Sequence, residues 1–298
     1  MPEVLRVATR SSRLALIQTR EFLEHLRHEL PRDVEFKLVK ARSKGDRVRD
    51  RPLHRLGEKG VFVKAIDRLV LKGKADFAVH SAKDMPSDPG YPVEFAAVPP
   101  RRDPRECLVS RTGARLKELP SGSTVGTSSP RRRAQILLER PDLEVKPLRG
   151  NVDTRVRKVK NGEVDATVLA KAGLERLGME SHISEVFEPE EFVPPAGQGA
   201  LLVTCRRGDD RVKRLLEHGD DPRSRVEVEV EKEVVRRLGA GCAEPVGVHA
   251  RARGSRVHVI LKLLDEDGAQ AKLVQGRGDP EEVVEEVVSR ARGVGSVE

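Results

Sequence analysis

The chain repeats part of its own sequence, and this repeat limits the possible folds more than any other feature. The segment Val7–Ser12 (VATRSS) is echoed by Val125–Ser129 (VGTSS), and Gly73–Val79 (GKADFAV) is echoed by Gly162–Val168 (GEVDATV). In both halves short apolar runs typical of strands alternate with segments whose apolar residues recur at helical spacing. The repeat therefore predicts two similar α/β domains with largely parallel sheets.

Two proline-rich segments indicate where the chain passes between these domains. Val98–Pro104 lies between the two halves of the repeat, and Val193–Pro195 leads through Gly197-Gln198-Gly199 into an apolar strand over 200–205. Two crossings predict a hinge, with the chain returning to its first domain. The charged, aperiodic stretch over 41–59 is interpreted as a mobile loop.

The last part of the chain has a different order of elements. It reads as a helix over 225–238, three strands near 246–250, 257–264 and 271–275, and a helix from 280. Short glycine-containing turns between the strands favour a small α+β domain with a three-stranded antiparallel sheet. The predicted domains are 1–99 with 200–219, 100–199, and 220–298.

Composition narrows the possible partners. The 298 residues carry a formal net charge of +8, so an anionic partner is expected. Nucleic acid is disfavoured because tryptophan is absent, Tyr91 is the only tyrosine, and few aromatic rings could stack on bases. The arginine-rich, asparagine-poor composition is also typical of proteins from hot habitats, where surface ion pairs contribute to stability.

No segment is apolar for long enough to cross a membrane, and the N-terminus lacks the features of a secretory signal. The sequence therefore predicts a cytoplasmic protein without a membrane partner. Three cysteines, without clustered metal ligands, favour neither a disulfide framework nor a metal site. Cys107 and Cys205 lie in apolar strands and are interpreted as buried. Cys242 lies in a glycine-bearing loop and is the candidate for chemistry.

Hydroxyl and arginine side chains gather where the predicted strands end. Ser11 and Ser12, and the segment Thr127–Ser129, stand at helix starts, where ligands of open α/β sheets bind. Helix capping by Ser129 is the alternative interpretation. Arg131 and Arg132 oppose the helix dipole unless an anion is held there, and a solvated basic face is their alternative.

Arg149 and Arg155 occupy a similar strand-to-helix junction and are expected to flank the domain cleft. Guanidinium groups bind carboxylates through two parallel hydrogen bonds, so several arginines together indicate a site for a polycarboxylate. Lys83 and Asp84 follow a buried strand at the same expected edge. Among so many arginines Asp84 would stay ionised, suited to bind an N–H group or stabilise a cation, although a surface ion pair is the alternative.

Seven segments, in this order, resemble the porphobilinogen deaminases, also called hydroxymethylbilane synthases. The resemblance spans nearly the whole chain, although Arg13 stands where the family usually has proline. The segments are Ala8–Ala15 (ATRSSRLA), Lys59–Phe62 (KGVF), His80–Pro86 (HSAKDMP), Gly126–Arg132 (GTSSPRR), Leu148–Asn151 (LRGN), Gly197–Ala200 (GQGA) and Gly241-Cys242. The resemblance implies a fold of two periplasmic-binding-protein-like α/β domains, with a hinge, plus an α+β domain that carries a cofactor cysteine.

The same resemblance implies a monomeric transferase of tetrapyrrole and heme biosynthesis. A dipyrromethane cofactor, joined by a thioether to Cys242, would receive four porphobilinogen units before hydroxymethylbilane and ammonia are released. Asp84 would be catalytic, and Lys59 and Phe62 would belong to a loop that covers the cleft. The residues matching family positions that hold carboxylates are Arg10, Ser12, Lys83, Thr127, Ser128, Ser129, Arg131, Arg132, Arg149, Arg155 and Arg176.

A module of the same two-lobed fold that binds anions without turnover is the main rival. It would use the arginines and hydroxyls equally well. It gives Cys242 and Asp84 no joint task, so the enzyme is favoured.

Overall fold

The computed structural model describes residues 3–31, 33–41, 61–87, 92–240, 244–265 and 267–293, without the side chains of Val61 and Phe62. The chain forms two compact units, Met1–Arg102 with Ala200–Arg225, and Asp103–Gly199 with Val226–Glu298. The predicted loop over 41–59 lies outside the described residues, apart from Ala41.

The first unit is built on a five-stranded sheet with the order β2-β1-β3-β10-β4. The strands β1, β2 and β3 pair in parallel, whereas β10 is antiparallel to both β3 and β4. Its elements are β1 (Glu3–Arg10), α1 (Arg13–Glu29), β2 (Val34–Ala41), α3 (Val61–Leu71), β3 (Phe77–Ser81), the single turn η2 (Ala82–Asp84), β4 (Val93–Ala97), β10 (Leu201–Arg206) and α7 (Asp210–Glu217).

The prediction of a largely parallel sheet is confirmed for four of the five strands, β2, β1, β3 and β4, which run in the same direction. Only β10 runs antiparallel to its neighbours. The reason is that β10 arrives by the long return crossing, so the geometry of a strand-helix-strand unit does not fix its direction.

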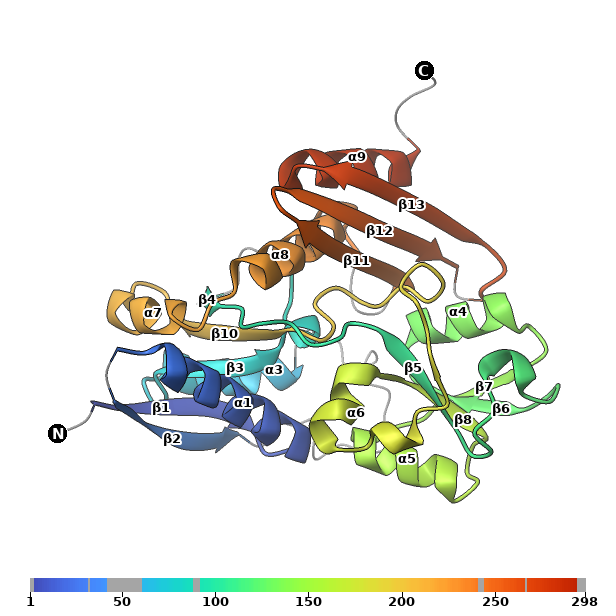
Figure 1. Ribbon diagram of the computed structural model, residues 1–298, viewed down its shortest axis with the longest axis horizontal. Helices are drawn as coiled ribbons and strands as arrows, with labels where there is room; N and C mark the ends of the chain where they lie inside the picture. Colours follow the sequence, from blue (N-terminus) through green and yellow to red (C-terminus); the bar gives the residue numbers. More distant parts are fainter. Residues whose placement is uncertain are drawn as a thin grey trace. The chain divides into compact units, whose positions relative to one another are not determined.

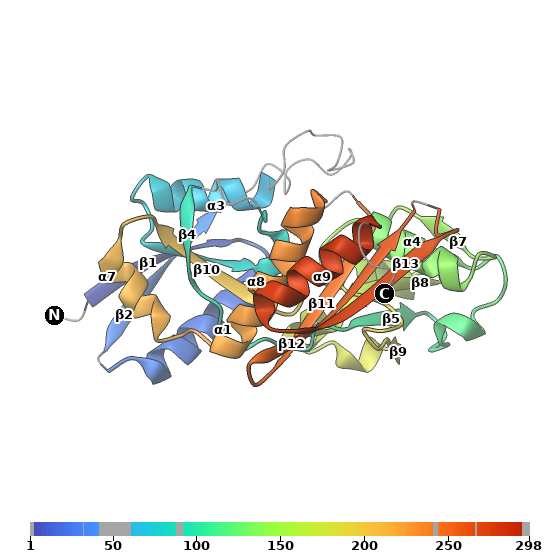
Figure 2. The ribbon, with the colours of Figure 1, turned by 90° about the horizontal axis from the view of Figure 1, so that it is seen from above.

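Helices cover both faces of this sheet (Figures 1 and 2). One face packs Leu5, Phe77 and Val203 against α1 and α7, and the other packs Ala8 and Ala78 against α3. The helix α1 presents Phe22, Leu23 and Leu26 to the core, at the helical spacing that buries one stripe.

The second unit contains a five-stranded sheet with the order β7-β6-β8-β5-β9. In this sheet β5 runs antiparallel to its neighbours β8 and β9. This order matches that of the first sheet, so the prediction of two similar α/β folds is confirmed. Its elements are β5 (Glu106–Ser110), η3 (Leu116–Glu118), β6 (Thr124–Gly126), α4 (Pro130–Glu139), β7 (Glu144–Lys146), α5 (Val152–Lys160), β8 (Ala166–Ala170), α6 (Lys171–Leu177), η4 (Glu180–His182) and β9 (Glu185–Val186).

The second unit also contains the antiparallel sheet β11-β12-β13, as predicted. Its strands are β11 (Val246–Arg253), β12 (Arg256–Leu264) and β13 (Ala271–Gly278), and the helices α8 (Pro222–Leu238) and α9 (Pro280–Arg292) flank them in sequence. Figures 1 and 2 show α9 lying along one face of this sheet, where Val283 and Val287 join its core.

The two sheets of the second unit are in contact through the return crossing and α4. The amide of Val248 donates to the carbonyl of Pro194 (2.8 Å). A Cβ added to Gly247 would lie 2.7 Å from the carbonyl oxygen of Val193, so only glycine allows this close approach. The fold class is confirmed, while the division into three domains stays a prediction.

Candidate functional site

The loop between β6 and α4 places three hydroxyl groups at the start of a helix. Ser129 is the N-cap residue of α4, and its hydroxyl accepts the amide hydrogen of Arg132 (3.4 Å). Thr127 accepts from the amide of Ser129 (3.2 Å), and Ser128 donates to the carbonyl of Leu148 (3.0 Å). The capping interpretation of Ser129 is therefore confirmed. Ser128 is exposed, so its hydroxyl remains accessible.

Arg131 and Arg132, in the first turn of α4, share one buried carboxylate. Glu106, the first residue of β5, accepts from Nε and Nη2 of Arg132 (3.0 and 2.8 Å) and also from Nη2 of Arg131. The Glu106 side chain is fully buried, and both arginines are at least 93% buried. The Glu106 carboxylate is thus an internal anion that compensates the two cations at the positive end of the helix dipole.

Arg131 and Gln135 also fix the return crossing. Nη1 of Arg131 and the side-chain amide of Gln135 both donate to the carbonyl of Val193, at 2.7 and 3.1 Å. The amide of Val193 donates in turn to Oε1 of Gln135 (2.8 Å). The sequence analysis did not predict the roles of Glu106 and Gln135. The one signal in the sequence was that Glu106 begins the otherwise apolar segment Glu106–Val109.

Arg155 has a different electrostatic environment. It lies on α5, and its Nε donates to the carbonyl of Gly150 (2.9 Å), where a φ of 120° requires glycine. Burial, followed by the positive charges of Arg132 and Arg149, lowers the pKa of Arg155 to about 10. An oxyanion bound among these three guanidinium groups would relieve their mutual repulsion.

Arg149 and Arg176 are both half-buried residues of the second unit. Nη2 of Arg176, on α6, donates to the carbonyl of Gly199 (3.3 Å), at the end of the glycine-rich segment that follows the return crossing. Gly199 has a φ of 85°, a conformation that favours glycine.

The predicted residues of the first unit lie at the ends of two adjacent strands. Arg10 is the last residue of β1, and Ser12 caps α1 by accepting the amide hydrogen of Ala15 (3.3 Å). Lys83 and Asp84 lie in η2, directly after β3. Asp84 is exposed and Lys83 is half-buried, so the carboxylate of Asp84 is available to a ligand.

A buried polar cluster, which sequence reasoning also missed, lies just before this turn. Oδ1 of Asp67, on α3, is 2.9 Å from Nε2 of His80 and accepts from the hydroxyl of Thr204 (3.1 Å). All three side chains are at least 95% buried. The cluster links α3, β3 and β10, and thereby fixes the strand end from which the Asp84 turn begins.

Comparison with known proteins identifies the family. Residues 5–214 match the family model described as "Porphobilinogen deaminase, dipyromethane cofactor binding domain", and residues 225–292 match "Porphobilinogen deaminase, C-terminal domain". The chain belongs to the porphobilinogen deaminase family.

Relatives in this family resemble the chain over almost its full length. A probable porphobilinogen deaminase of Methanopyrus kandleri is 71% identical over 295 residues, which are 99% of both chains. A probable porphobilinogen deaminase of Methanothermobacter thermautotrophicus is 45% identical over 270 residues, 91% of this chain and 92% of that relative. Among solved structures, the probable amino-acid ABC transporter extracellular-binding protein ytmK of Bacillus subtilis covers 74% of this chain and 90% of its own, with 12% identity and a TM-score of 0.46.

Three residues that the porphobilinogen deaminase resemblance singles out lie wholly or partly outside the described part of the chain. Cys242 and Lys59 lie outside the described residues, and for Phe62 only the backbone, within α3, is described. The other two cysteines are buried as predicted, and burial raises the pKa of the Cys107 thiol to about 12 and that of Cys205 to about 11. Both thiols are therefore protonated and poorly nucleophilic at neutral pH.

Within the ranges that the structure describes, no helix is long and apolar enough to span a membrane. The same ranges contain no group of three histidine, cysteine or carboxylate side chains arranged to bind a metal ion.

Proposed function

We propose that this chain catalyses the head-to-tail condensation of four porphobilinogen molecules, releasing hydroxymethylbilane and ammonia, as a cytoplasmic monomer. Membership of the porphobilinogen deaminase family supports the reaction. The single structural observation that carries the proposal is the group formed by Arg132, Arg149 and Arg155, in which burial, and then the charges of the other two arginines, lower the pKa of Arg155. Such a group is suited to the acetate and propionate side chains of pyrroles.

The residues present fit a dipyrromethane cofactor, which carries several carboxylates. When bound, this group supplies the terminal pyrrole carbon to which new units are joined. Cys242 is the proposed attachment residue, because the other two thiols are buried and protonated. The proposed carboxylate-binding residues are Arg10, Ser12, Lys83, Thr127, Ser128, Ser129, Arg131, Arg132, Arg149, Arg155 and Arg176.

Arg132 illustrates how these side chains would bind a carboxylate. Its Nε and Nη2 face Glu106, which places Nη1 on the opposite side of the planar guanidinium group. In the proposed site Nη1 donates to an acetate or propionate, while Glu106 holds the group in place. Binding then requires no reorientation of the side chain, so little conformational entropy is lost.

Asp84 is the proposed catalytic residue. Its exposed carboxylate can accept the N–H of a pyrrole ring and stabilise positive charge that develops on that ring. The buried cluster of Asp67, His80 and Thr204 fixes the strand end before it. Lys83, adjacent and half-buried, is proposed to bind a carboxylate of the same ligand.

Incubation of the purified protein with porphobilinogen tests this proposal. Ammonia should be released, and oxidation of the product in acid should yield porphyrin, which is detected by its absorbance. The Asp84→Asn variant should fold normally but lose roughly a hundredfold to a thousandfold in turnover. A wild-type protein that binds porphobilinogen without releasing ammonia would instead be the non-catalytic anion-binding module.

A further inference from the structure

The antiparallel sheet of the second unit has two unlike faces. Val248, Ala250 and Ala252 alternate along β11 toward the core shared with α8 and α9. The residues between them point to the opposite face. Near Gly247 the opposite face is covered by the return crossing, and Nζ of Lys262 donates to the carbonyl of Glu191 (2.9 Å).

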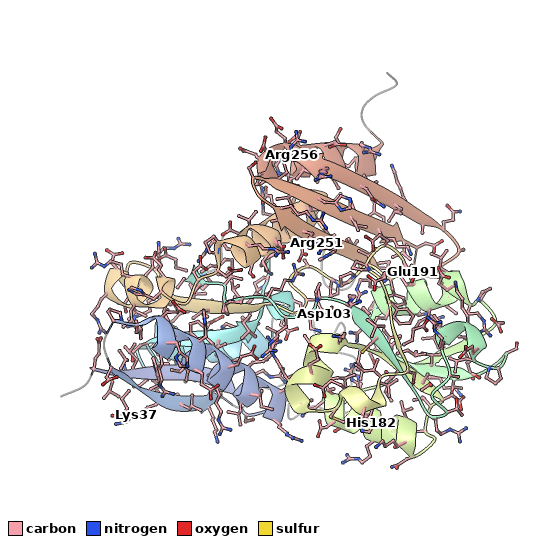
Figure 3. All side chains as sticks on the ribbon, in the orientation of Figure 1. Lys37, Asp103, His182, Glu191, Arg251 and Arg256 are labelled. Atoms are coloured by element: carbon pink, nitrogen blue, oxygen red, sulfur yellow. The ribbon has the colours of Figure 1, made fainter. Side chains whose placement is uncertain are left out.

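The other end of this opposite face carries only cationic or titratable side chains. Strand pairing places Arg251 opposite His258, and His258 opposite Arg277, while Arg253 lies opposite Arg256 in the next row. All four arginines are exposed, and His258 is half-buried. We call these five residues the arginine face. Figure 3 labels two of them, Arg251 and Arg256.

No acidic residue balances the arginine face from its own strands, because β11, β12 and β13 contain neither Asp nor Glu. The acids next to these strands are the exposed Asp279, which directly follows β13 at the register of Arg256, and the buried Glu227 of α8, whose Oε1 accepts from the amide of Ala252 (3.0 Å). Like charges directly opposite each other destabilise a pair of strands. Arg253 and Arg256 are such a pair, and an anion bound beside them would compensate their charge.

Arginines on the neighbouring helices behave differently. Arg236 and Arg237 both bind Glu233 on α8, and Arg290 binds Glu286 on α9. A general enrichment in surface ion pairs explains those residues but leaves the arginine face unexplained. A site for an external anion explains it.

The spacing of the arginine face determines the class of ligand. Neighbouring strands are about 4.8 Å apart and alternate residues about 6.6 Å apart, so the five side chains cover roughly 10 by 7 Å. A patch of five side chains is small for a specific nucleic-acid interface, and the three strands contain no Phe, Tyr or Trp for stacking. Guanidinium groups at this spacing match clustered phosphate or carboxylate oxygens.

We propose that the arginine face binds a small multivalent oxyanion, such as an oligophosphate or a polycarboxylate. This site is separate from the arginines of α4 and α5 and does not depend on the proposed reaction. Its occupation would compensate the like charges of Arg253 and Arg256 and stabilise the folded protein.

Isothermal titration calorimetry tests this proposal, with tripolyphosphate and citrate as probes. The purified protein is used with the dipyrromethane still attached. Wild type should bind at least one probe saturably at constant ionic strength. The Arg251→Gln/Arg277→Gln variant should bind it at least tenfold more weakly, because each charged hydrogen bond contributes about 1.5 kcal/mol or more, or roughly tenfold in affinity. Tighter binding of tripolyphosphate would identify phosphate as the ligand chemistry, and tighter binding of citrate would identify carboxylate.

The Arg20→Gln/Arg214→Gln variant is the matched control, because it removes the same charge from exposed positions on α1 and α7. Its affinity should equal that of wild type, and both double variants, Arg251→Gln/Arg277→Gln and Arg20→Gln/Arg214→Gln, should retain wild-type turnover of porphobilinogen. Equal weakening in the control would overturn the proposal, since net charge alone would then explain binding. Loss of binding in Arg155→Gln but not in Arg251→Gln/Arg277→Gln would also overturn it, as would tighter binding of a 20-base-pair DNA duplex through the same two arginines.

Discussion

The arginines of α4 and those around α5 belong to the same unit but meet opposite electrostatic conditions. Arg131 and Arg132 are buried against the carboxylate of Glu106. For Arg155, burial and then the positive charges of Arg132 and Arg149 lower the pKa. Glu106 thus stabilises the fold by holding Arg131 and Arg132 in place, whereas an external anion would relieve the repulsion that Arg155 meets.

Removal of the internal counterion should have the largest effect. Glu106→Gln leaves two buried guanidinium groups without a carboxylate, so the free energy of unfolding should fall by about 3–5 kcal/mol. Urea denaturation measures this change. Glu144→Gln is the control, because Glu144 forms an exposed pair with Lys146 (3.0 Å) and should cost less than about 1 kcal/mol. Equal small losses in both variants would show that Glu106 does not support the arginines.

Removal of Arg155, which its neighbours repel, should lower turnover without lowering stability. Arg155→Gln eliminates a cation that its neighbours disfavour, so the free energy of unfolding of the protein without its dipyrromethane primer (primer-free protein) should stay unchanged or rise. Turnover should fall roughly tenfold to a hundredfold, because one charged hydrogen bond to the substrate is lost. Arg131→Gln, in contrast, should destabilise the protein. If Arg155→Gln is as destabilised as Arg131→Gln, the distinction between the two groups is wrong.

The titration of Arg155 should depend on the bound anion. In primer-free Cys242→Ser protein, NMR of the guanidinium carbon should show a pKa of about 10 for Arg155. A bound carboxylate favours the charged form and should raise this pKa, so by linkage the affinity for the anion decreases as pH rises above about 10. The same spectra of wild type, with its primer, should show no titration near this pH. An identical titration in both proteins would place the anion elsewhere.

The two serine caps should show the smallest effects. Ser12→Ala and Ser129→Ala each remove one hydroxyl that accepts a backbone amide, and each should lower the free energy of unfolding by about 1 kcal/mol. Thermal unfolding of the two variants measures this. A Ser129→Ala variant with normal stability but strongly reduced turnover would assign that hydroxyl to the ligand instead of the helix.

The sequence was sufficient to predict the two similar α/β folds and the antiparallel sheet, because local periodicity and the internal repeat report on elements directly. It also located the hydroxyl caps and the buried cysteines. The antiparallel β10 was not predicted, since its direction depends on a crossing from a distant part of the chain. Glu106 and the Asp67–His80 pair were missed because their partners are 13 to 137 residues away in sequence. A buried acid and its partner are joined by tertiary packing, which periodicity does not report.

The intact mass of the purified protein tests the central claim, that Cys242 and the arginines around α5 together hold a dipyrromethane. Protein produced in cells that make porphobilinogen should exceed its sequence mass by one dipyrromethane unit. After digestion this increment should map to the peptide containing Gly241-Cys242-Ala243, with Cys107 and Cys205 unmodified. Cys242→Ser should show the bare sequence mass and no turnover. Wild-type protein at its bare sequence mass, yet fully active with porphobilinogen, would contradict the account.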